Sequence, residues 1–327
     1  MTLKNLLLVF LSLFFFLIII EVILRLKGDM PRSSPDFTIN EPLINIPDPK
    51  LGWVPKKGIH KFKPWSDKGK NTYLTINSDK SRFTGEVKEN KKKIIFIGGS
   101  ITQGWAVNDD ETFSSLIQKK NNNYKVFNYG VGGYGGYQSL LMLEKIIKDK
   151  DEVELIIYGL IPHHEIRNVA AGSWMYLLNF FSARGFISLP YGSIDKDNKL
   201  IKNPPIEYIT LPFGTISSLI AKIEKRIMKV KSLFREKKQT DISLSIINEM
   251  NEISLKNNSK FILLILDDFH DERSMVYDLF LKKKNIPFIK CTLPKGQEYI
   301  VLGDGHPNEL SHKNISECIY KKLKLVN

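Results

Sequence analysis

The feature that most constrains the fold is a repeated alternation of short apolar runs with longer amphipathic segments in the last two thirds of the chain. Five apolar runs, rich in Ile, Val, Phe and Leu, occur at 91–99, 124–130, 153–160, 260–268 and 287–292. Short apolar runs that end at Gly or Asp are typical of strands buried on both faces of a sheet. The sequence therefore predicts a parallel sheet of about five strands.

The segments between these runs have helical periodicity. Helices are expected at 109–120, 135–149, 241–257, 272–285 and within 304–325. Strands that alternate with helices form parallel βαβ units, whose helices cover both faces of the sheet. The predicted fold class is therefore α/β, a three-layer α/β/α arrangement. A chain of 327 residues is long enough for one such domain and an appendage.

The N-terminus carries an uninterrupted apolar run, Leu6–Ile20, which extends to Leu26 with only Glu21 and Arg25 as charged residues. About 20 apolar residues in a helix span a bilayer. A cleaved signal peptide is the alternative, but no small-residue cleavage site follows the run. We favour an uncleaved transmembrane signal anchor over 1–27. Basic residues lie on both sides of it, so the positive-inside rule does not set its orientation.

The anchor predicts a single-pass membrane protein, and we expect the remaining domain to be extracytoplasmic. Residues 28–90 are rich in Pro, Asp, Lys and Ser and are expected to be a tether with irregular or short β structure. A domain is then expected over 91–327. The strand and helix rhythm lapses at about 165–240, which indicates an insertion that could cover a site.

The insertion includes a helix expected at 216–238 with a basic face. Its apolar residues recur at helical spacing at Ile216, Leu219, Ile220, Ile223, Ile227, Val230 and Phe234. A membrane-surface helix is one interpretation. We favour the other, a helix whose apolar stripe packs on the sheet while its basic face is solvated.

Charge and cysteine content exclude few functions. There are 48 Lys and Arg against 35 Asp and Glu, which gives a formal net charge of +13. This excess is spread along the chain and accompanies no nucleic-acid motif, so no nucleic-acid partner is expected. The two cysteines, Cys291 and Cys318, could pair, but we expect small buried side chains rather than a disulfide framework.

Three stretches with unusual residues follow predicted strands: Gly98–Ser100, Gly130–Gly136 and Asp304–His306. In open parallel sheets, ligands bind beyond the carboxyl ends of the strands. Glycines allow the backbone to turn sharply there and expose Ser100, whose N–H can also meet an oxyanion. His306 can act as its base and Asp304 can orient the imidazole. Ser, His and Asp are the residues of nucleophilic acyl transfer. A phosphate-binding turn is the alternative for the glycines.

The sequence here resembles the SGNH, or GDSL-like, hydrolase superfamily. "GGSITQG" is similar to its first block, "NYGVGGYGGYQ" to its second and "DGHPN" to its last, and the resemblance covers residues 91–327. It implies a flavodoxin-like sheet with Ser100 as nucleophile and first oxyanion donor, His306 as base and Asp304 as its partner. It also implies Gly133 as the second oxyanion donor, with Gly132 as the alternative.

The sequence departs from the family pattern at three places. The residue before the serine is Gly99 instead of Asp, and one residue instead of two separates Asp304 from His306. The third block lacks its oxyanion Asn and reads "YGLIPHHEIRN". His163 or His164 is expected to donate in its place, since an imidazole can be a donor.

Several alternatives concern this altered third block. Asn168 is a second candidate donor, Arg167 and Glu165 could form an ion pair that shapes the loop, and the two histidines could be purely structural. Zinc at His163, His164 and His306 is a rival interpretation, but no Cys or helical His pair completes a ligand set. No metal and no cofactor are therefore expected.

Three functions follow from these observations. The first is a membrane-anchored serine esterase that cleaves acyl esters, acetyl esters first, on an envelope glycan or lipid. The second is an O-acyltransferase that passes the acyl group to a glycan hydroxyl. The third is an inactive glycan-binding or assembly protein on a hydrolase fold. The sequence favours the first. It does not identify the substrate or the oligomeric state.

Overall fold

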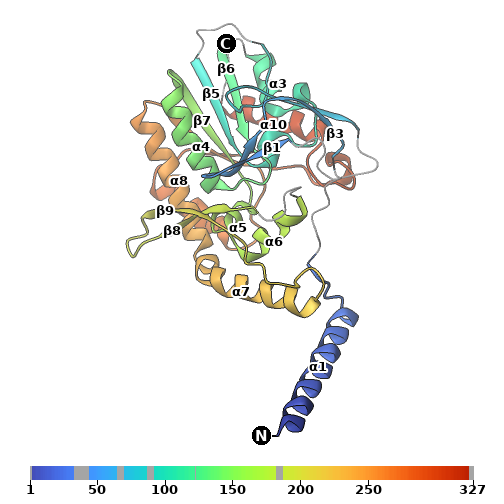
Figure 1. Ribbon diagram of the computed structural model, residues 1–327. Helices are drawn as coiled ribbons and strands as arrows, with labels where there is room; N and C mark the ends of the chain where they lie inside the picture. Colours follow the sequence, from blue (N-terminus) through green and yellow to red (C-terminus); the bar gives the residue numbers. More distant parts are fainter. Residues whose placement is uncertain are drawn as a thin grey trace.

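The computed structural model describes residues 2–32, 44–64, 70–86, 92–121, 123–181 and 187–323. Its centre is a five-stranded sheet in the order β11-β10-β7-β5-β6, with every neighbouring pair parallel (Figure 1). The strands are β5 (Lys92–Gly98), β6 (Tyr124–Gly130), β7 (Val153–Leu160), β10 (Lys260–Ile265) and β11 (Phe288–Lys290). This is the flavodoxin-like order. The predicted fold class and the count of about five strands are confirmed.

Helices cover both faces of the sheet. The helices α3 (Phe113–Lys120) and α10 (Glu309–Leu323) pack on one face, and α4 (Gly136–Asp149), α8 (Gln239–Lys256) and α9 (Arg273–Lys283) on the other. Alternate side chains of β5 separate into the two cores: Ile94 and Phe96 face α3 and α10, while Ile95 and Ile97 face α4 and α8. Burial on both faces explains why this strand is an unbroken apolar run.

The segment before β5 forms two antiparallel hairpins against the domain. They are β1 (Asn45–Asp48) with β2 (Gly52–Pro55), and β3 (Gly58–Phe62) with β4 (Thr72–Ile76). Trp53 of β2 is buried in the core that α4 and α8 also line. Arg82 pairs with Asn128 at the β6 edge. Residues 33–43, 65–69 and 87–90 of the expected tether, and residue 91 of the expected domain, lie outside the described residues.

The expected insertion contains α5 (His164–Asn168), α6 (Gly172–Phe181), a hairpin of β8 (Leu189–Ile194) and β9 (Leu200–Ile206), and α7 (Ser218–Lys237). The packing predicted for the helix at 216–238 is wrong. Helix α7 contacts α6, α8 and the N-terminal helix rather than the sheet, which α8 covers instead. Residues 182–186 of the insertion lie outside the described residues.

The N-terminal helix α1 (Leu3–Leu26) projects away from the domain (Figure 1). Its most apolar stretch has a mean hydropathy of 3.1, and its side chains are almost all exposed. A helix of this length and composition is compatible with a single-pass membrane anchor or with a signal sequence.

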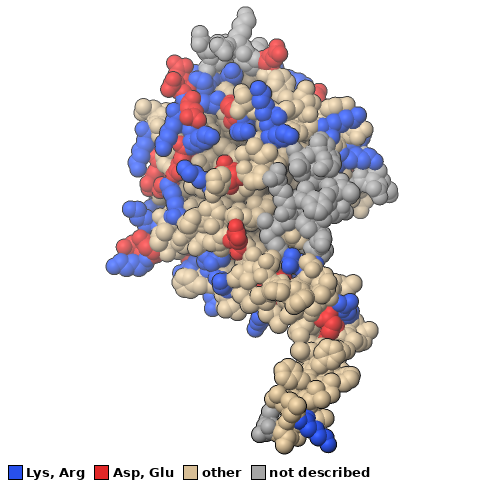
Figure 2. All heavy atoms as spheres, viewed as in Figure 1, with Lys and Arg blue, Asp and Glu red and all other residues tan. Residues whose placement is uncertain are grey.

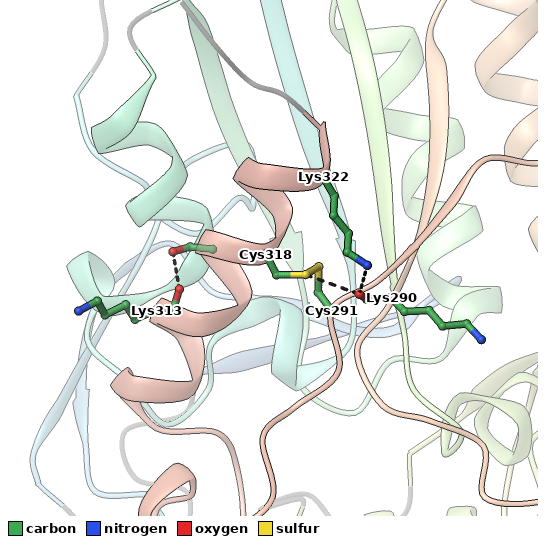
Figure 3. Close-up of a disulfide and its surroundings, with 6 residues drawn as sticks. Lys290, Cys291, Lys313, Cys318 and Lys322 are labelled. Atoms are coloured by element: carbon green, nitrogen blue, oxygen red, sulfur yellow. Dashed lines mark hydrogen bonds between the residues drawn. A yellow bond between two sulfur atoms is a disulfide. The ribbon is translucent and has the colours of Figure 1, made fainter.

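The structure corrects the expectation that the two cysteines are unpaired buried side chains, because they form a disulfide. Cys291, just after β11, is bonded to Cys318 of α10 (Figure 3). Lys322 of α10 also donates to the carbonyl of Lys290, at 2.9 Å. The folded sheet edge brings together two cysteines that are 27 residues apart. The bond fastens the last helix, which follows the Asp304–His306 loop, to the edge strand.

We expect reduction of this disulfide to lower the free energy of unfolding by about 3 kcal/mol, because the bond restricts the unfolded chain over a loop of this length. Thermal unfolding of the full chain in detergent, followed by near-UV circular dichroism with and without dithiothreitol, measures the effect. The Cys291→Ser/Cys318→Ser variant is the control and should not respond to the reductant. An equal melting temperature for the oxidised and reduced wild-type protein would contradict this expectation.

Candidate active site

The turn after β5 is shaped by two glycines that leave room for other side chains. A Cβ at Gly98 would lie 2.3 Å from Oγ1 of Thr102 and 2.9 Å from the carbonyl oxygen of Gly159. A Cβ at Gly99 would lie 2.7 Å from Nε2 of His164. Larger residues cannot occupy these positions without displacing the neighbours. The turn therefore places Ser100 as the first residue of the short helix α2 (Ser100–Gln103), at the carboxyl edge of the sheet.

Ser100, His306 and Asp304 form a hydrogen-bonded chain. The hydroxyl oxygen of Ser100 lies 2.9 Å from Nε2 of His306, and Nδ1 of His306 lies 2.6 Å from Oδ1 of Asp304. The side chain of Asp304 is fully buried, whereas that of His306 is 21% exposed. An imidazole between a hydroxyl and a buried carboxylate can take the hydroxyl proton, while the carboxylate stabilises the resulting cation.

The short spacing between Asp304 and His306 is accommodated by a tight turn. Gly305 adopts φ +84°, a left-handed conformation that glycine reaches without strain. The carboxylate of Asp304 also accepts the backbone N–H of His306, and the N–H of Val301 donates to the His306 carbonyl. These contacts allow one intervening residue to position the pair.

Two backbone N–H groups at the cavity are candidates to bind an oxyanion. The Ser100 N–H belongs to the first turn of α2 and has no partner within the helix. Gly133 lines the same cavity, and within the described part of the chain its N–H has no acceptor. The Gly132 N–H is already used, since it donates to Gln103 at 2.9 Å. Gly133 is therefore the better placed of the two glycines.

A cavity of about 1110 Å³ surrounds these groups. Trp53, Trp105 and Trp174 line the cavity, and so do the three residues Ser100, Asp304 and His306. The indole of Trp53 comes from the hairpin that precedes the sheet, and its Nε1 donates to the carbonyl of Gly132 at 3.1 Å. The N-terminal hairpins therefore complete the cavity. Aromatic walls with a few polar groups are typical of small-molecule sites.

The two histidines of the third block occupy different environments. His163 is exposed on the cavity wall. His164 is buried behind Gly99, where Nδ1 lies 2.7 Å from the hydroxyl of Tyr158, and Nε2 is also inaccessible. Burial lowers the pKa of His164 well below its usual value, so the ring is neutral. The expectation that His164 donates to a substrate is therefore wrong for this arrangement, because the ring does not reach the cavity.

Arg167 lies at the cavity, a place that was not assigned to it from the sequence. It lines the cavity, its guanidinium stacks 4.4 Å from the ring of Trp174, and its Nη1 donates to the Tyr134 carbonyl at 3.0 Å. Nη1 would lie 3.3 Å from a Cβ at Gly99, next to the serine. Burial lowers the pKa of Arg167 to about 10, so the side chain stays charged at neutral pH.

The ion pair between Arg167 and Glu165, one of the alternatives from the sequence, does not form, since each of these side chains contacts other residues. Glu165 pairs with Arg273 of α9 at 2.6 Å and accepts the Tyr277 hydroxyl at 3.0 Å. One feature of the sequence could have indicated that Arg167 lies at the cavity. It follows the predicted strand at 153–160, and ligands bind where the strands of such sheets end.

The other candidates of the third block lie away from the cavity. Asn168 is buried, accepts the Tyr137 N–H and donates to the hydroxyl of Ser243, so it is not directed at the serine. Among the described residues, no group of three or more His, Cys, Asp and Glu side chains could hold a metal ion.

A fully buried histidine of α10 packs against α3. His312 of α10 accepts the Phe113 N–H at 3.2 Å and stacks on the Phe113 ring. Burial, together with the charges of Arg82 and His306, lowers the pKa of His312 to about 3. His312 therefore stays neutral in the folded protein under conditions that protonate it in the unfolded chain.

This difference predicts a loss of stability in acid. Between about pH 6.5 and pH 3, His312 is protonated in the unfolded chain but neutral in the folded protein. The free energy of unfolding therefore decreases as the pH is lowered through this range. We expect a contribution of roughly 3 kcal/mol between pH 6.5 and pH 4. Urea unfolding at both pH values measures it. His312→Gln, which can still accept the Phe113 N–H, should show a shallower pH dependence, and an unchanged slope would contradict the assignment.

Comparison with known proteins finds similarity in structure only. No protein-family model and no curated protein matches the sequence. The solved structure of TesA is 11% identical over 72% of this chain and 100% of its own, with a TM-score of 0.43. The esterase EstA from Pseudoalteromonas sp. is 11% identical over 72% of this chain and 97% of its own, with a TM-score of 0.43.

AlinE4, described as an SGNH-hydrolase family esterase, is also 11% identical, over 72% of this chain and 97% of its own, with a TM-score of 0.36. Similarity at this level does not transfer an activity. The function proposed below rests on the geometry of the site.

Proposed function

We propose that this chain is a serine hydrolase of the SGNH type that cleaves acyl esters through a covalent acyl-Ser100 intermediate. The observation that carries the proposal is the hydrogen-bonded chain of Ser100, His306 and Asp304 at the wall of a large cavity. It lies at the carboxyl edge of a parallel sheet, where such folds bind ligands. Gly133 is assigned as the second oxyanion donor.

The reaction proceeds in two steps. The Ser100 oxygen attacks the ester carbonyl carbon while its proton passes to Nε2 of His306. The tetrahedral oxyanion accepts hydrogen bonds from the N–H groups of Ser100 and Gly133. It collapses by breaking the bond to the alcohol oxygen, which takes the proton from His306. Water then attacks the acyl-enzyme by the same route, and the acid leaves.

We assign the third oxyanion-stabilising contact to Arg167, with His163 at the cavity wall as the alternative. The guanidinium of Arg167 lies beside Gly99 and is held by Trp174 and the Tyr134 carbonyl. A fixed positive charge near the developing oxyanion stabilises the transition state more than the neutral ester.

We propose that the enzyme acts at the cell envelope, anchored by α1 with the catalytic domain outside the cytoplasm. The disulfide between Cys291 and Cys318 supports this location, because disulfides persist in oxidising compartments. The substrate is assigned as a short acyl ester, acetyl first, on a glycan or lipid. The three indole rings of the cavity wall fit the apolar face of a sugar or the chain of a lipid.

Labelling with a fluorophosphonate probe tests the activated serine directly. The full chain in detergent should be labelled at Ser100 and should hydrolyse p-nitrophenyl acetate faster than longer-chain esters. Addition of saccharide acceptors then separates hydrolysis from acyl transfer through the products formed. A folded wild-type protein that is neither labelled nor active would overturn the hydrolase assignment and favour a binding function.

A further inference from the structure

Helix α7 presents its apolar side chains outward, contrary to the usual arrangement in a soluble domain. The buried residues of α7 recur every three or four positions: Ser218, Ala221, Glu224, Met228 and Ser232. The opposite face carries exposed apolar side chains at Ile223, Val230 and Phe234, and Phe234 is 77% exposed. A contiguous exposed apolar stripe indicates a surface that contacts another apolar phase.

The N-terminal end of α7 is joined to the end of α1 by several hydrogen bonds. The carboxylate of Glu21 accepts the N–H groups of Ser218 and Leu219 at 2.8 and 3.0 Å, and Arg25 donates to the Ile216 carbonyl at 2.7 Å. Lys222 of α7 pairs with Asp29 just after α1. These contacts fix the position of α7 relative to α1.

The contact also sets the level of α7 relative to a bilayer. The uninterrupted apolar run of α1 ends at Ile20, and Glu21 is the first charged residue after it. If α1 spans the membrane, Glu21 lies near the end of the hydrocarbon region, and α7 begins beside it. Figure 1 shows α7 running from there across the side of the domain that faces α1.

The charge of α7 fits an anionic surface. Seven Lys and Arg side chains and two Glu side chains occur within Ser218–Lys237, and Glu224 is buried against the domain. Figure 2 shows Lys and Arg side chains among uncharged ones along this side of the molecule. Basic side chains near an anionic leaflet contribute about 1 kcal/mol each, in addition to burial of the apolar stripe.

We propose that α7 is an interfacial helix that lies on the surface of an anionic bilayer, with Ile223, Val230 and Phe234 inserted among the lipids. This proposal rests on the assignment of α1 as a membrane anchor. It gives the domain two attachments to the membrane, so that α1 holds it there and α7 sets its orientation. The catalytic cavity is thereby held at a fixed height and angle to the bilayer.

Site-specific fluorescence on the full chain tests the proposal. The native cysteines are paired, so a cysteine introduced as Phe234→Cys or Val230→Cys can be labelled with an NBD dye under non-reducing conditions. Both positions lie about 18–24 Å along α7 from its first residue, beyond direct contact with α1. Lys119→Cys on α3, an exposed position on the far side of the domain from α1, is the matched control.

In vesicles of phosphatidylglycerol and phosphatidylcholine that contain doxyl-labelled lipid, we expect quenching at 230 and 234 about threefold stronger than at 119. Quenching should fall by about half in pure phosphatidylcholine or after Arg226→Glu/Lys229→Glu. Lys282→Glu/Lys283→Glu on α9 controls for the change of charge. Equal quenching at all three dye positions, or shielding of the dye by a second protein molecule, would overturn the proposal.

Flotation of the same vesicles separates this inference from the anchor. A chain that does not float contradicts the assignment of α1 as an anchor. A chain that floats but shows no preferential quenching at 230 and 234 contradicts the role of α7 alone. Hydrolysis of p-nitrophenyl acetate in detergent reports the active site independently of both.

Discussion

Replacement of Ser100 by Ala is expected to lower kcat for p-nitrophenyl acetate by about 10⁴- to 10⁶-fold and to abolish fluorophosphonate labelling. The hydroxyl that lies 2.9 Å from Nε2 of His306 is the nucleophile of the first step, which forms the acyl-enzyme. Its removal leaves the N–H groups of residue 100 and Gly133 in place, so some substrate binding should remain. In energy terms the loss is about 5–8 kcal/mol of transition-state stabilisation.

The control for this variant is a serine on the same cavity wall that is not hydrogen-bonded to His306. Ser173 is exposed there, and Ser173→Ala should keep its labelling and most of its kcat. Near-UV circular dichroism establishes that both variants are folded. If Ser100→Ala retains more than a hundredth of the wild-type kcat, Ser100 is not the nucleophile.

The second large effect is expected for Asp304→Asn, which should lower kcat by about 10⁴-fold with little change in KM. Asp304 is buried and accepts from both Nδ1 and the backbone N–H of His306. An amide at this position removes the charge that stabilises the imidazolium in the transition state, and its NH₂ group favours the wrong tautomer of the ring. The binding cavity itself is not altered.

Asp267 provides the matched carboxylate control, because it also lines the cavity. Asp267→Asn should change kcat less than about tenfold, since the proposed mechanism uses no proton at this position. The pH profile gives a further readout. If Asp304 acts through His306, its variant should lose activity across the whole pH range, whereas a purely structural role would change the thermal unfolding without this loss. A kcat for Asp304→Asn within tenfold of wild type would contradict the triad.

The elements of the sheet were predictable because local sequence carries the information. The strands of the sheet are short, mostly apolar runs, as burial on both faces requires, and several of them end in a turn residue. Ser100 stands at such an end, and Asp304 and His306 stand in the loop between the last strand and the last helix. Residue type and position in the fold together indicated all three. The structure places the His306 ring within hydrogen-bond distance of both Ser100 and Asp304.

The side-chain contacts of the third sequence block, "YGLIPHHEIRN", were not predictable in the same way. Arg167 and Glu165 are two residues apart and opposite in charge, which favoured a local pair. In the folded protein Arg273 of α9 reaches Glu165, and Trp174 of α6 holds Arg167 at the cavity. The partner of Glu165 comes from a helix 108 residues away, and Arg167 turns instead to the next helix, and no local pattern specifies either contact.

The sequence by itself determined the succession of the main strands and helices along the chain, the presence of an apolar N-terminal helix and the candidate catalytic residues. Hydrophobic periodicity and turn chemistry act over a few neighbouring residues, so they can be read without the fold. Only the tertiary structure decided that Cys291 meets Cys318, that Trp53 closes the cavity and that α7 turns its apolar stripe outward. These outcomes depend on which surfaces the other elements leave open, because the same amphipathic helix can bury either face according to what lies against it.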